Sequence, residues 1–304
     1  CDIVRVSVYD RECADALPKI KKEIHIPIVA DIHFDHTLAL LAVENGADKL
    51  RINPGNIPNP EHAGRLARVC KERGIPIRIG VNSGSLSKDI LKQYGGVTPE
   101  ALAESALRHV DILEKNAFED IVISVKASDV RLMISSYRLL AERVDYPLHL
   151  GVTEAGTSRV GIIKSAIGIG TLLEEGIGDT IRVSLTGSPV AEVTAGKDIL
   201  RSLGLIREGI DIISCPTCGR CRIPLEQVVN EVERALGNVK KPIKIAIMGC
   251  VVNGPGEARE ADIGLAGGDG CGVIFKKGEM LKKVSEEEMI PELIKEIKAM
   301  LDNT

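Results

Sequence analysis

The sequence predicts an α/β protein, built as a β/α barrel and followed by a smaller α+β domain. Three observations indicate this fold. Short β-branched segments alternate with helical segments through about the first 200 residues, the pattern of βαβ units and a parallel sheet. Aromatic residues make up 2% of the chain and Trp is absent, so the core consists of aliphatic residues, as in parallel strands covered by helices. Beyond about residue 205 the alternation ends and cysteines cluster.

The first domain, residues 1–205, is expected to be a TIM-type barrel. The predicted strands are 3–8, 27–31, 49–53, 76–81, 120–126, 147–152 and 180–185, with helical patterns between them, for example at 99–116 and 130–143. A closed barrel of this type needs eight strands. The first βα unit is therefore expected to be missing from the sequence, before Cys1. An open, doubly wound sheet is the alternative.

Two further segments depart from the βα alternation. Residues 83–98 lengthen the connection between two predicted strands, and we expect either a lid loop or an ordinary surface loop there. The second domain, residues 206–304, contains a predicted strand at 243–248, a Gly-rich stretch at 264–272 and a final helix at about 286–301.

Composition excludes several classes of function. The net charge of −4 and the pI near 6.0 argue against a nucleic-acid-binding protein, which is usually basic. No apolar run approaches the roughly 18 residues that span a membrane. Eight cysteines in such a chain indicate metal or redox chemistry rather than a disulfide framework. We therefore expect a cytoplasmic protein that binds neither nucleic acid nor membrane.

Cations recur on strands that should be apolar. Side chains two apart on a strand face the same side, so a cation and its small polar neighbour point together toward the barrel interior. An unpaired buried guanidinium is costly, and Arg and Lys suit phosphate oxygens. The sequence thus predicts a phosphate or diphosphate ligand; internal pairing with Asp31, Asp48 and Glu154 is the alternative. The set comprises Arg5 with Ser7, Arg51 with Asn53, Arg78 with Asn82, Ser124 with Lys126, and Arg182 with Ser184.

Asp31, His33 and Glu154 follow predicted strands and are candidates for proton transfer. The remaining histidines are expected on the surfaces of helices or strands, without a function: His25, His36, His62, His109 and His149.

The cysteines of the second domain favour an iron–sulfur cluster. Cys215 and Cys218 form a C-x-x-C motif after a predicted strand at 209–213, and Cys250 follows the strand at 243–248. Thiolates at this spacing hold one metal ion or two corners of a cluster. Two alternatives remain: a structural zinc site that also uses Cys221, and a redox-active dithiol.

Six strings then carry a resemblance that spans nearly the whole chain. In order, VRVSV, ADIHF, RINPGN, RIGVNSGSL, CPTCGR and GCVVNGPGEA closely resemble the 4-hydroxy-3-methylbut-2-enyl diphosphate synthases, enzymes of the non-mevalonate route to isoprenoid precursors. The last two motifs are highly specific. The first strand and helix of that family are absent here, and Cys221 is a thiol that the family pattern does not predict.

The resemblance implies a two-electron iron–sulfur oxidoreductase. Its [4Fe–4S] cluster would be held by Cys215, Cys218, Cys250 and the carboxylate of Glu257. It would open the ring of 2-C-methyl-D-erythritol 2,4-cyclodiphosphate and remove a hydroxyl group, with electrons from flavodoxin or ferredoxin. The resemblance implies substrate binding by Arg5, Arg51, Arg78, Asn82, Lys126, Arg182 and Ser184, and a catalytic role for Glu154, with Asp31 and His33 nearby.

It further implies a homodimer in which the cluster domain of one chain caps the barrel of the other. The rival from another class is a non-redox phosphate-binding barrel with a structural zinc domain.

Overall fold

The computed structural model describes residues 1–32, 35–52, 60–237, 239–251 and 259–302. These residues form two compact units, Cys1–Leu203 and Gly204–Thr304. The predicted residues His33, Asn53 and Glu257 lie outside the described residues.

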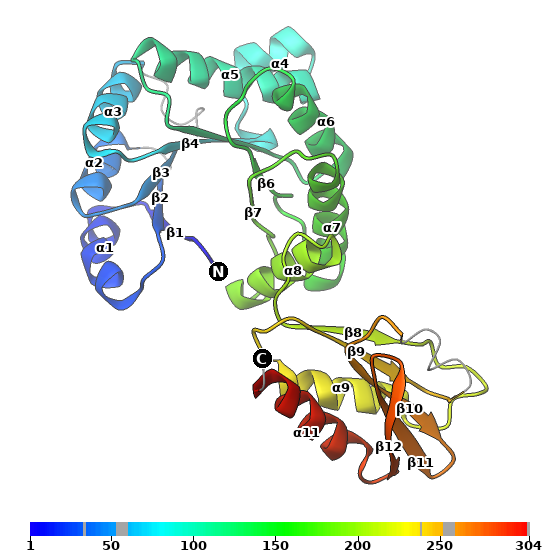
Figure 1. Ribbon diagram of the computed structural model, residues 1–304. Helices are drawn as coiled ribbons and strands as arrows, with labels where there is room; N and C mark the ends of the chain where they lie inside the picture. Colours follow the sequence, from blue (N-terminus) through cyan, green and yellow to red (C-terminus); the bar gives the residue numbers. More distant parts are fainter. Residues whose placement is uncertain (33–34, 53–59, 238, 252–258, 303–304) are drawn as a thin grey trace. The chain divides into compact units, whose positions relative to one another are not determined.

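The first unit consists of alternating strands and helices, with the strands on the inside and the helices around them (Figure 1). Its strands are β1 (Val4–Val8), β2 (Ile28–Ile32), β3 (Lys49–Ile52), β4 (Ile77–Asn82), β5 (Ile121–Lys126), β6 (His149–Leu150) and β7 (Thr180–Ile181). Its helices are α1 (Arg11–Glu23), α2 (His36–Glu44), α3 (Pro60–Arg73), α4 (Lys88–Tyr94), α5 (Pro99–Lys115), α6 (Val130–Ala141), α7 (Ser158–Glu174) and α8 (Pro189–Ser202).

The strands β1 to β5 form one parallel sheet in the order of the sequence. A single parallel bridge between Ile123 and Leu148 links β5 to β6, and β6 pairs in parallel with β7. The predicted α/β class with a parallel sheet is confirmed. Within the described ranges, no strand pairing joins β7 to β1.

The last two strands of this unit are shorter than predicted. The sequence predicts strands at 147–152 and 180–185, but each observed strand has two residues. β-branched runs predict extended backbone, whereas a strand also needs a paired neighbour. After Leu150 the chain leaves the sheet through Gly151 and reaches a turn in which Glu154 and Gly156 have positive φ.

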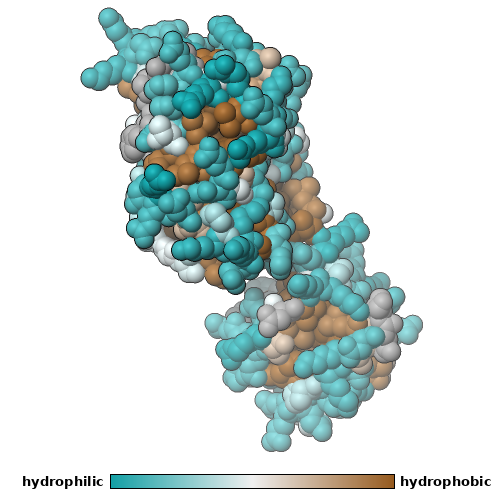
Figure 2. All heavy atoms as spheres, turned by 90° about the vertical axis from the view of Figure 1, so that its left-hand side faces the viewer, coloured by the Kyte–Doolittle hydropathy of each residue, from teal (hydrophilic) through white to brown (hydrophobic). Residues whose placement is uncertain are grey.

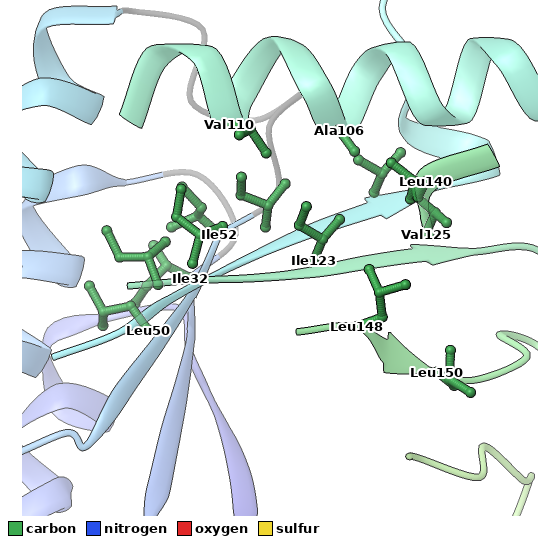
Figure 3. Close-up of a cluster of buried hydrophobic side chains, with 14 of the residues drawn as sticks. Ile32, Leu50, Ile52, Ala106, Val110, Ile123, Val125, Leu140, Leu148 and Leu150 are labelled. Atoms are coloured by element: carbon green, nitrogen blue, oxygen red, sulfur yellow. The ribbon is translucent and has the colours of Figure 1, made fainter. Parts of the chain in front are cut away.

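The core of the first unit lies between the sheet and the helices. Figure 3 shows Ile123 and Val125 of β5 on the side of the sheet that faces Ala106 and Val110 of α5. All four are almost fully buried. Because side chains alternate along a strand, Ser124 and Lys126 on β5 point to the opposite side, toward the interior of the unit. This alternation places the polar residues of several strands together.

A buried tyrosine supports the join between β5 and β6, where backbone pairing is sparse. The Tyr137 hydroxyl of α6 accepts a hydrogen bond from the Val125 N–H at 3.2 Å and donates one to the carbonyl oxygen of His149. Tyr137 is fully buried, and burial raises its pKa above the ordinary value. It replaces a strand-to-strand backbone bond with a side-chain bridge.

Replacing Tyr137 with phenylalanine is expected to lower the free energy of unfolding by about 1–3 kcal/mol, since the Val125 N–H and the His149 carbonyl lose their shared partner. Chemical denaturation measures the change. Tyr146→Phe is the matched control, because the Tyr146 hydroxyl bonds Glu114 at an exposed site, and it should change stability by less than about 0.5 kcal/mol. Equal effects of the two substitutions would contradict the bridging role.

The insertion at 83–98 folds as ordered structure. A short 3₁₀ turn (Ser83–Ser85) leads into α4, which packs on α5. Arg108 of α5 pairs with Asp89 of α4 at 2.5 Å and donates a hydrogen bond to Gln93 at 2.9 Å. Ile90 is buried below. We expected either a lid loop or an ordinary surface loop in this segment. The observed packed helix is closer to ordinary surface structure.

The second unit is a five-stranded mixed sheet with α9 (Leu225–Leu236) and α11 (Met289–Asp302) packed on it (Figure 1). The strand order is β12 (Glu279–Ser285), β11 (Cys271–Lys276), β10 (Ile263–Gly268), β9 (Ile243–Met248) and β8 (Ile210–Ser214). The strands β8, β9 and β10 run in parallel, so their carboxyl ends lie at one edge of the sheet. Its core contains Val232, Ile245, Leu265 and Leu293.

The face drawn in Figure 2 is mostly hydrophilic, with apolar atoms showing in patches between the polar side chains. None of the helices in the described part of the chain is long and apolar enough to cross a bilayer.

Candidate active site

The inward-facing polar residues of the first unit enclose a cavity of about 230 Å³. Every one of the five predicted cations lines it, although they come from five different strands or strand ends. The lining residues are Arg5, Ser7, Asp31, Arg51, Arg78, Asn82, Ser124, Lys126, Thr153 and Arg182. The parallel register explains the convergence, since Asp31 is level with Ser7 and Arg51, and Arg51 with Arg78.

One carboxylate holds two of these cations. Asp31 is 2% exposed. Its Oδ2 lies 2.9 Å from Nη1 of Arg5, and its Oδ1 lies 2.7 Å from Nη1 of Arg51. Internal pairing with Asp31, one of the alternatives from the sequence, therefore occurs for these two arginines. Asp48, by contrast, pairs with Lys21 and accepts a hydrogen bond from the Ile28 N–H.

Arg51 of β3 pairs with Asp31 of β2 and also lies over Gly80 of β4, a strand position that has no side chain. A Cβ atom built at Gly80 of β4 would lie 2.4 Å from Nε of Arg51. Any larger residue at Gly80 would have to displace the guanidinium. The glycine therefore sets the position of one predicted ligand-binding cation.

Replacing Gly80 with alanine is expected to weaken binding of inorganic pyrophosphate about tenfold or more, because a misplaced Arg51 loses charge-assisted hydrogen bonds of about 1.5–3 kcal/mol. Isothermal titration calorimetry measures the affinity. Gly170→Ala in α7 is the control, since a Cβ there meets nothing within 4 Å. Unchanged affinity in Gly80→Ala would show that Arg51 does not contact the anion.

The two most buried cations have no ion-pair partner among the described residues. Arg78 is 5% exposed and Lys126 is 6% exposed. Burial lowers the pKa of Lys126 well below its ordinary value, and the nearby positive charges of Arg78 and Arg182 lower it further. Burial also lowers the pKa of Arg78, with smaller effects from Arg5 and Arg51. Such a site stores unfavourable electrostatic energy that an anionic ligand relieves.

Arg182 also lines the cavity and is held by a polar neighbour. Its Nη2 donates a hydrogen bond to Oγ of Ser184 at 3.0 Å. A Cβ at Gly151 would lie 2.5 Å from the carbonyl oxygen of Arg182 and 3.1 Å from Nζ of Lys126. Gly151 thus leaves room for both cationic residues. Ser184 does not itself line the cavity as the structure describes it.

His149 of β6 is half-buried rather than on an open strand surface, so the expectation for this histidine holds only in part. Its Nδ1 lies 2.8 Å from Oγ1 of Thr180. Its Nε2 is buried without a hydrogen-bond partner in the described structure. Burial lowers the pKa of His149 well below its ordinary value, and the positive charges of Lys126 and Arg78 lower it further. A neutral imidazole therefore lies near the cations.

The predicted proton-transfer residues are not equally placed. Asp31 is buried in the cavity wall, whereas Glu154 is exposed in the turn after β6 and has a positive φ of 51°. Non-glycine residues in this conformation are uncommon and cluster at functional sites. Thr153, the residue before it, lines the cavity. Thr153 escaped sequence reasoning because a lone threonine after Val152 carries no motif.

The predicted cluster ligands lie at the carboxyl edge of the second sheet. Cys215 and Cys218 follow β8, and Cys250 follows β9. The Gly249 N–H donates a hydrogen bond to Sγ of Cys215 at 3.3 Å. The pKa of the Cys218 thiol is lowered by hydrogen bonds from the backbone and side chain of Arg220.

The thiols of these two loops are compatible with the sulfur ligands of an iron–sulfur cluster. Over the ranges that the structure describes, no three side chains of His, Cys, Asp or Glu converge closely enough to hold a metal ion. An iron–sulfur cluster is larger than one ion, and hydrogen bonds to its sulfur ligands are typical of such sites. The donor set of three thiols on two adjoining loops, with an N–H directed at one sulfur, fits that group.

Comparison with known proteins gives consistent matches over nearly the whole chain. Residues 1–197 match the GcpE TIM-barrel domain, and residues 211–299 match the GcpE protein C-terminal domain. The chain is 62% identical over 301 residues to the 4-hydroxy-3-methylbut-2-en-1-yl diphosphate synthase (flavodoxin) of Caldanaerobacter subterraneus subsp. tengcongensis, covering 99% of this chain and 85% of that protein. It is also 62% identical to the enzyme of the same name from Clostridium tetani, covering 98% and 85%.

Two solved structures show weak similarity to the chain. The HMG-CoA lyase from Brucella melitensis has a TM-score of 0.47 at 14% identity, over 67% of this chain and 79% of that one. The dihydropteroate synthase from Yersinia pestis, in complex with a sulfonamide drug, has a TM-score of 0.45 at 10% identity, over 68% and 81%.

Proposed function

The chain belongs to the GcpE family of 4-hydroxy-3-methylbut-2-en-1-yl diphosphate synthases, and on that premise we propose that it catalyses the step for which these relatives are named. The substrate is 2-C-methyl-D-erythritol 2,4-cyclodiphosphate. Two electrons and two protons enter, one ring C–O bond opens, and a hydroxyl group leaves as water to give the linear allylic diphosphate. The enzyme is an iron–sulfur oxidoreductase of isoprenoid precursor biosynthesis.

The observation that carries this proposal is the cavity in which five cations face a single carboxylate among the described lining residues. A diphosphate brings several negative charges to a site where Arg78 and Lys126 have no ion-pair partner within the described part of the chain. Arginine binds phosphate oxygens in a bidentate manner, and lysine acts as a point charge. A neutral or cationic substrate would leave these charges unrelieved.

The proposed roles follow the contacts. Arg5 and Arg51, oriented by Asp31, bind phosphate oxygens, and Arg182, oriented by Ser184, adds a further contact. Because its carboxylate is engaged by two arginines, the proposed role of Asp31 is to orient these cations, not to transfer a proton. Glu154 at the exposed turn is the proposed proton donor or acceptor. Arg78, Asn82 and Lys126 complete the binding set, and His33 is assigned beside it by family resemblance alone.

The proposed cofactor is a [4Fe–4S] cluster held by Cys215, Cys218, Cys250 and Glu257. When bound, it supplies single electrons, which reach it from flavodoxin or ferredoxin. The protein's own part is to fix the thiols at the edge of the second sheet, through contacts such as the Gly249 N–H to Cys215 hydrogen bond.

The proposed assembly is a homodimer in the cytoplasm, in which the second unit of one chain covers the cavity of its partner. A covered cavity excludes water from a reactive intermediate. This arrangement explains why the cations and the thiols belong to separate units of one chain.

The test is an anaerobic assay of the purified chain with the cyclodiphosphate and reduced flavodoxin, combined with thermal unfolding in inorganic pyrophosphate. Formation of the allylic diphosphate is expected. Pyrophosphate at about 100 times its Kd should stabilise the folded chain by about 2.7 kcal/mol. Stoichiometric zinc without sulfide, and no turnover, would instead support the non-redox barrel, which the relatives do not favour.

A further inference from the structure

Gly249 joins the two segments that carry the predicted thiol ligands. Its N–H donates to Sγ of Cys215 at 3.3 Å, and its carbonyl oxygen accepts a hydrogen bond from the Arg222 N–H at 2.8 Å. One residue of the β9 loop is therefore bonded to both ends of the segment 215–222. These contacts exist within the protein chain itself, without any bound group.

Cys221 fills the space directly over Gly249. A Cβ atom built at Gly249 would lie 2.5 Å from Sγ of Cys221 and 3.3 Å from its Cβ. A real side chain at Gly249 would therefore collide with the thiol. The Cys221 N–H also donates to the carbonyl oxygen of Cys218 at 2.9 Å. Cys221 thus contacts the Cys218 turn and the Gly249 loop at once.

The Cys221 thiol is anchored on its other side by the core. Its Sγ donates a hydrogen bond to the carbonyl oxygen of Ile223 at 3.2 Å. Ile223 is 7% exposed, and a Cβ at Gly267 of β10 would lie 2.6 Å from its side chain. Contacts therefore run without a break from β10 through Ile223 and Cys221 to Gly249 and Cys215.

The sulfur of Cys221 already has partners within the chain on two sides. It is 3.2 Å from the carbonyl oxygen of Ile223 and lies over the backbone of Gly249. This geometry favours a packing role for the side chain.

We propose that Cys221 is a positioning residue that holds the two cysteine-bearing loops together and is not itself a ligand of the cluster. The inference rests on the proposed function, because that function supplies the cluster. The contacts of Cys221 and Gly249 are features of the protein chain and do not depend on it. It accounts for a thiol that the family pattern does not predict. It also assigns Gly249 a steric role, as the position over which the Cys221 sulfur fits.

The test uses a set of variants that separates contact from ligation. Cys221→Ser keeps a hydrogen-bond donor and should retain the iron content and the EPR spectrum of the reduced protein. Gly249→Ala forces the loops apart and should release iron to a chelator about tenfold faster under argon, since changes just outside a metal's ligands typically cost about 10–100-fold in affinity. Gly249→Ala combined with Cys221→Ala removes the colliding sulfur and should restore slow release. Cys271→Ser is the control for loss of a thiol in the same unit.

A change of the EPR spectrum and loss of iron in Cys221→Ser would overturn the proposal and make Cys221 a ligand. Failure of the double variant to recover, while it folds by circular dichroism, would overturn the steric contact.

Amide hydrogen exchange in the cluster-free wild-type chain gives an independent measurement. The Gly249 and Arg222 N–H groups should exchange slowly there, and more rapidly in Gly249→Ala. Rapid exchange of both groups in the wild-type chain would overturn the proposal. If the protein carries no cluster at all, the proposed function fails, while this exchange measurement still decides whether the loops are joined.

Discussion

Replacing Cys250 with serine is expected to reduce bound iron from about four atoms per chain to fewer than about one, and to abolish turnover. Cys250 follows β9, next to Gly249, whose N–H is bonded to Sγ of Cys215. It is the only predicted thiol ligand on the loop that follows β9; the other two lie on the loop that follows β8. Without it, two thiols on one short segment remain, Cys215 and Cys218, and the proposed carboxylate ligand Glu257 binds iron more weakly than a thiolate does.

Iron and acid-labile sulfide analysis with EPR spectroscopy, on protein prepared without oxygen, measures this effect. Cys271→Ser is the matched control, because Cys271 is a half-buried thiol of the same sheet that has no proposed ligand role. It should retain the full iron content. Four irons in both variants would show that Cys250 is not a ligand, and stoichiometric zinc in the wild-type chain would point to a structural metal site.

Much of the first unit was predictable because its strands carry two signals at once. On β5, Ile123 and Val125 face the helices and Ser124 and Lys126 face inward. The alternation of apolar and polar residues predicted both the strand itself and the side of the sheet on which its cation would lie. The parallel register then brought Arg5, Arg51, Arg78, Lys126 and Arg182 to one cavity, although no local pattern states their distances.

The features that escaped prediction depend on residues far apart in the sequence. His149 has the local pattern of an ordinary strand residue, and only the pairing of β6 with β7 places it against Thr180. The role of Gly80 depends on Arg51, which reaches over it from the neighbouring strand. The steric match of Cys221 with Gly249 likewise joins segments separated by a helix and a strand. Such contacts follow from the fold, not from spacing.

The two carboxylates predicted for proton transfer, Asp31 and Glu154, differ in burial. Asp31 is a plausible acid from its place after a strand, yet its carboxylate is engaged by two arginines. Glu154 has the opposite character, because it is exposed and held in an uncommon backbone conformation. The two carboxylates, which the sequence treats alike, therefore differ in burial, partners and backbone conformation.

Replacing Lys126 with methionine is expected to stabilise the substrate-free enzyme and to impair catalysis at the same time. Lys126 is 6% exposed, has no ion-pair partner among the described residues, and has neighbouring cations. An apolar side chain of similar length avoids the cost of burying that charge, so the free energy of unfolding should rise by about 1–4 kcal/mol. The lost phosphate contact should lower kcat/KM about a hundredfold.

The pH dependence of stability distinguishes this cause from simple repacking. The pKa of Lys126 is lower in the folded state than in the unfolded chain. Between those two values the unfolded chain binds more protons, so the contribution of Lys126 makes the folded state more stable as the pH rises toward about 10.4. The advantage of Lys126→Met over the wild type should therefore be largest at low pH and shrink as the pH rises through this window.

Urea unfolding at several pH values between about 7 and 10 measures both quantities. Lys115→Met serves as the control, since Lys115 is exposed and pairs with Asp111 at 2.5 Å; it should change stability by less than about 0.5 kcal/mol at every pH. A stability gain in Lys126→Met that is independent of pH would show that packing, not charge, is responsible. A loss of stability would mean that the Lys126 amine has a stabilising partner in the native protein. The cavity would then bind an anion more weakly than its five cations indicate.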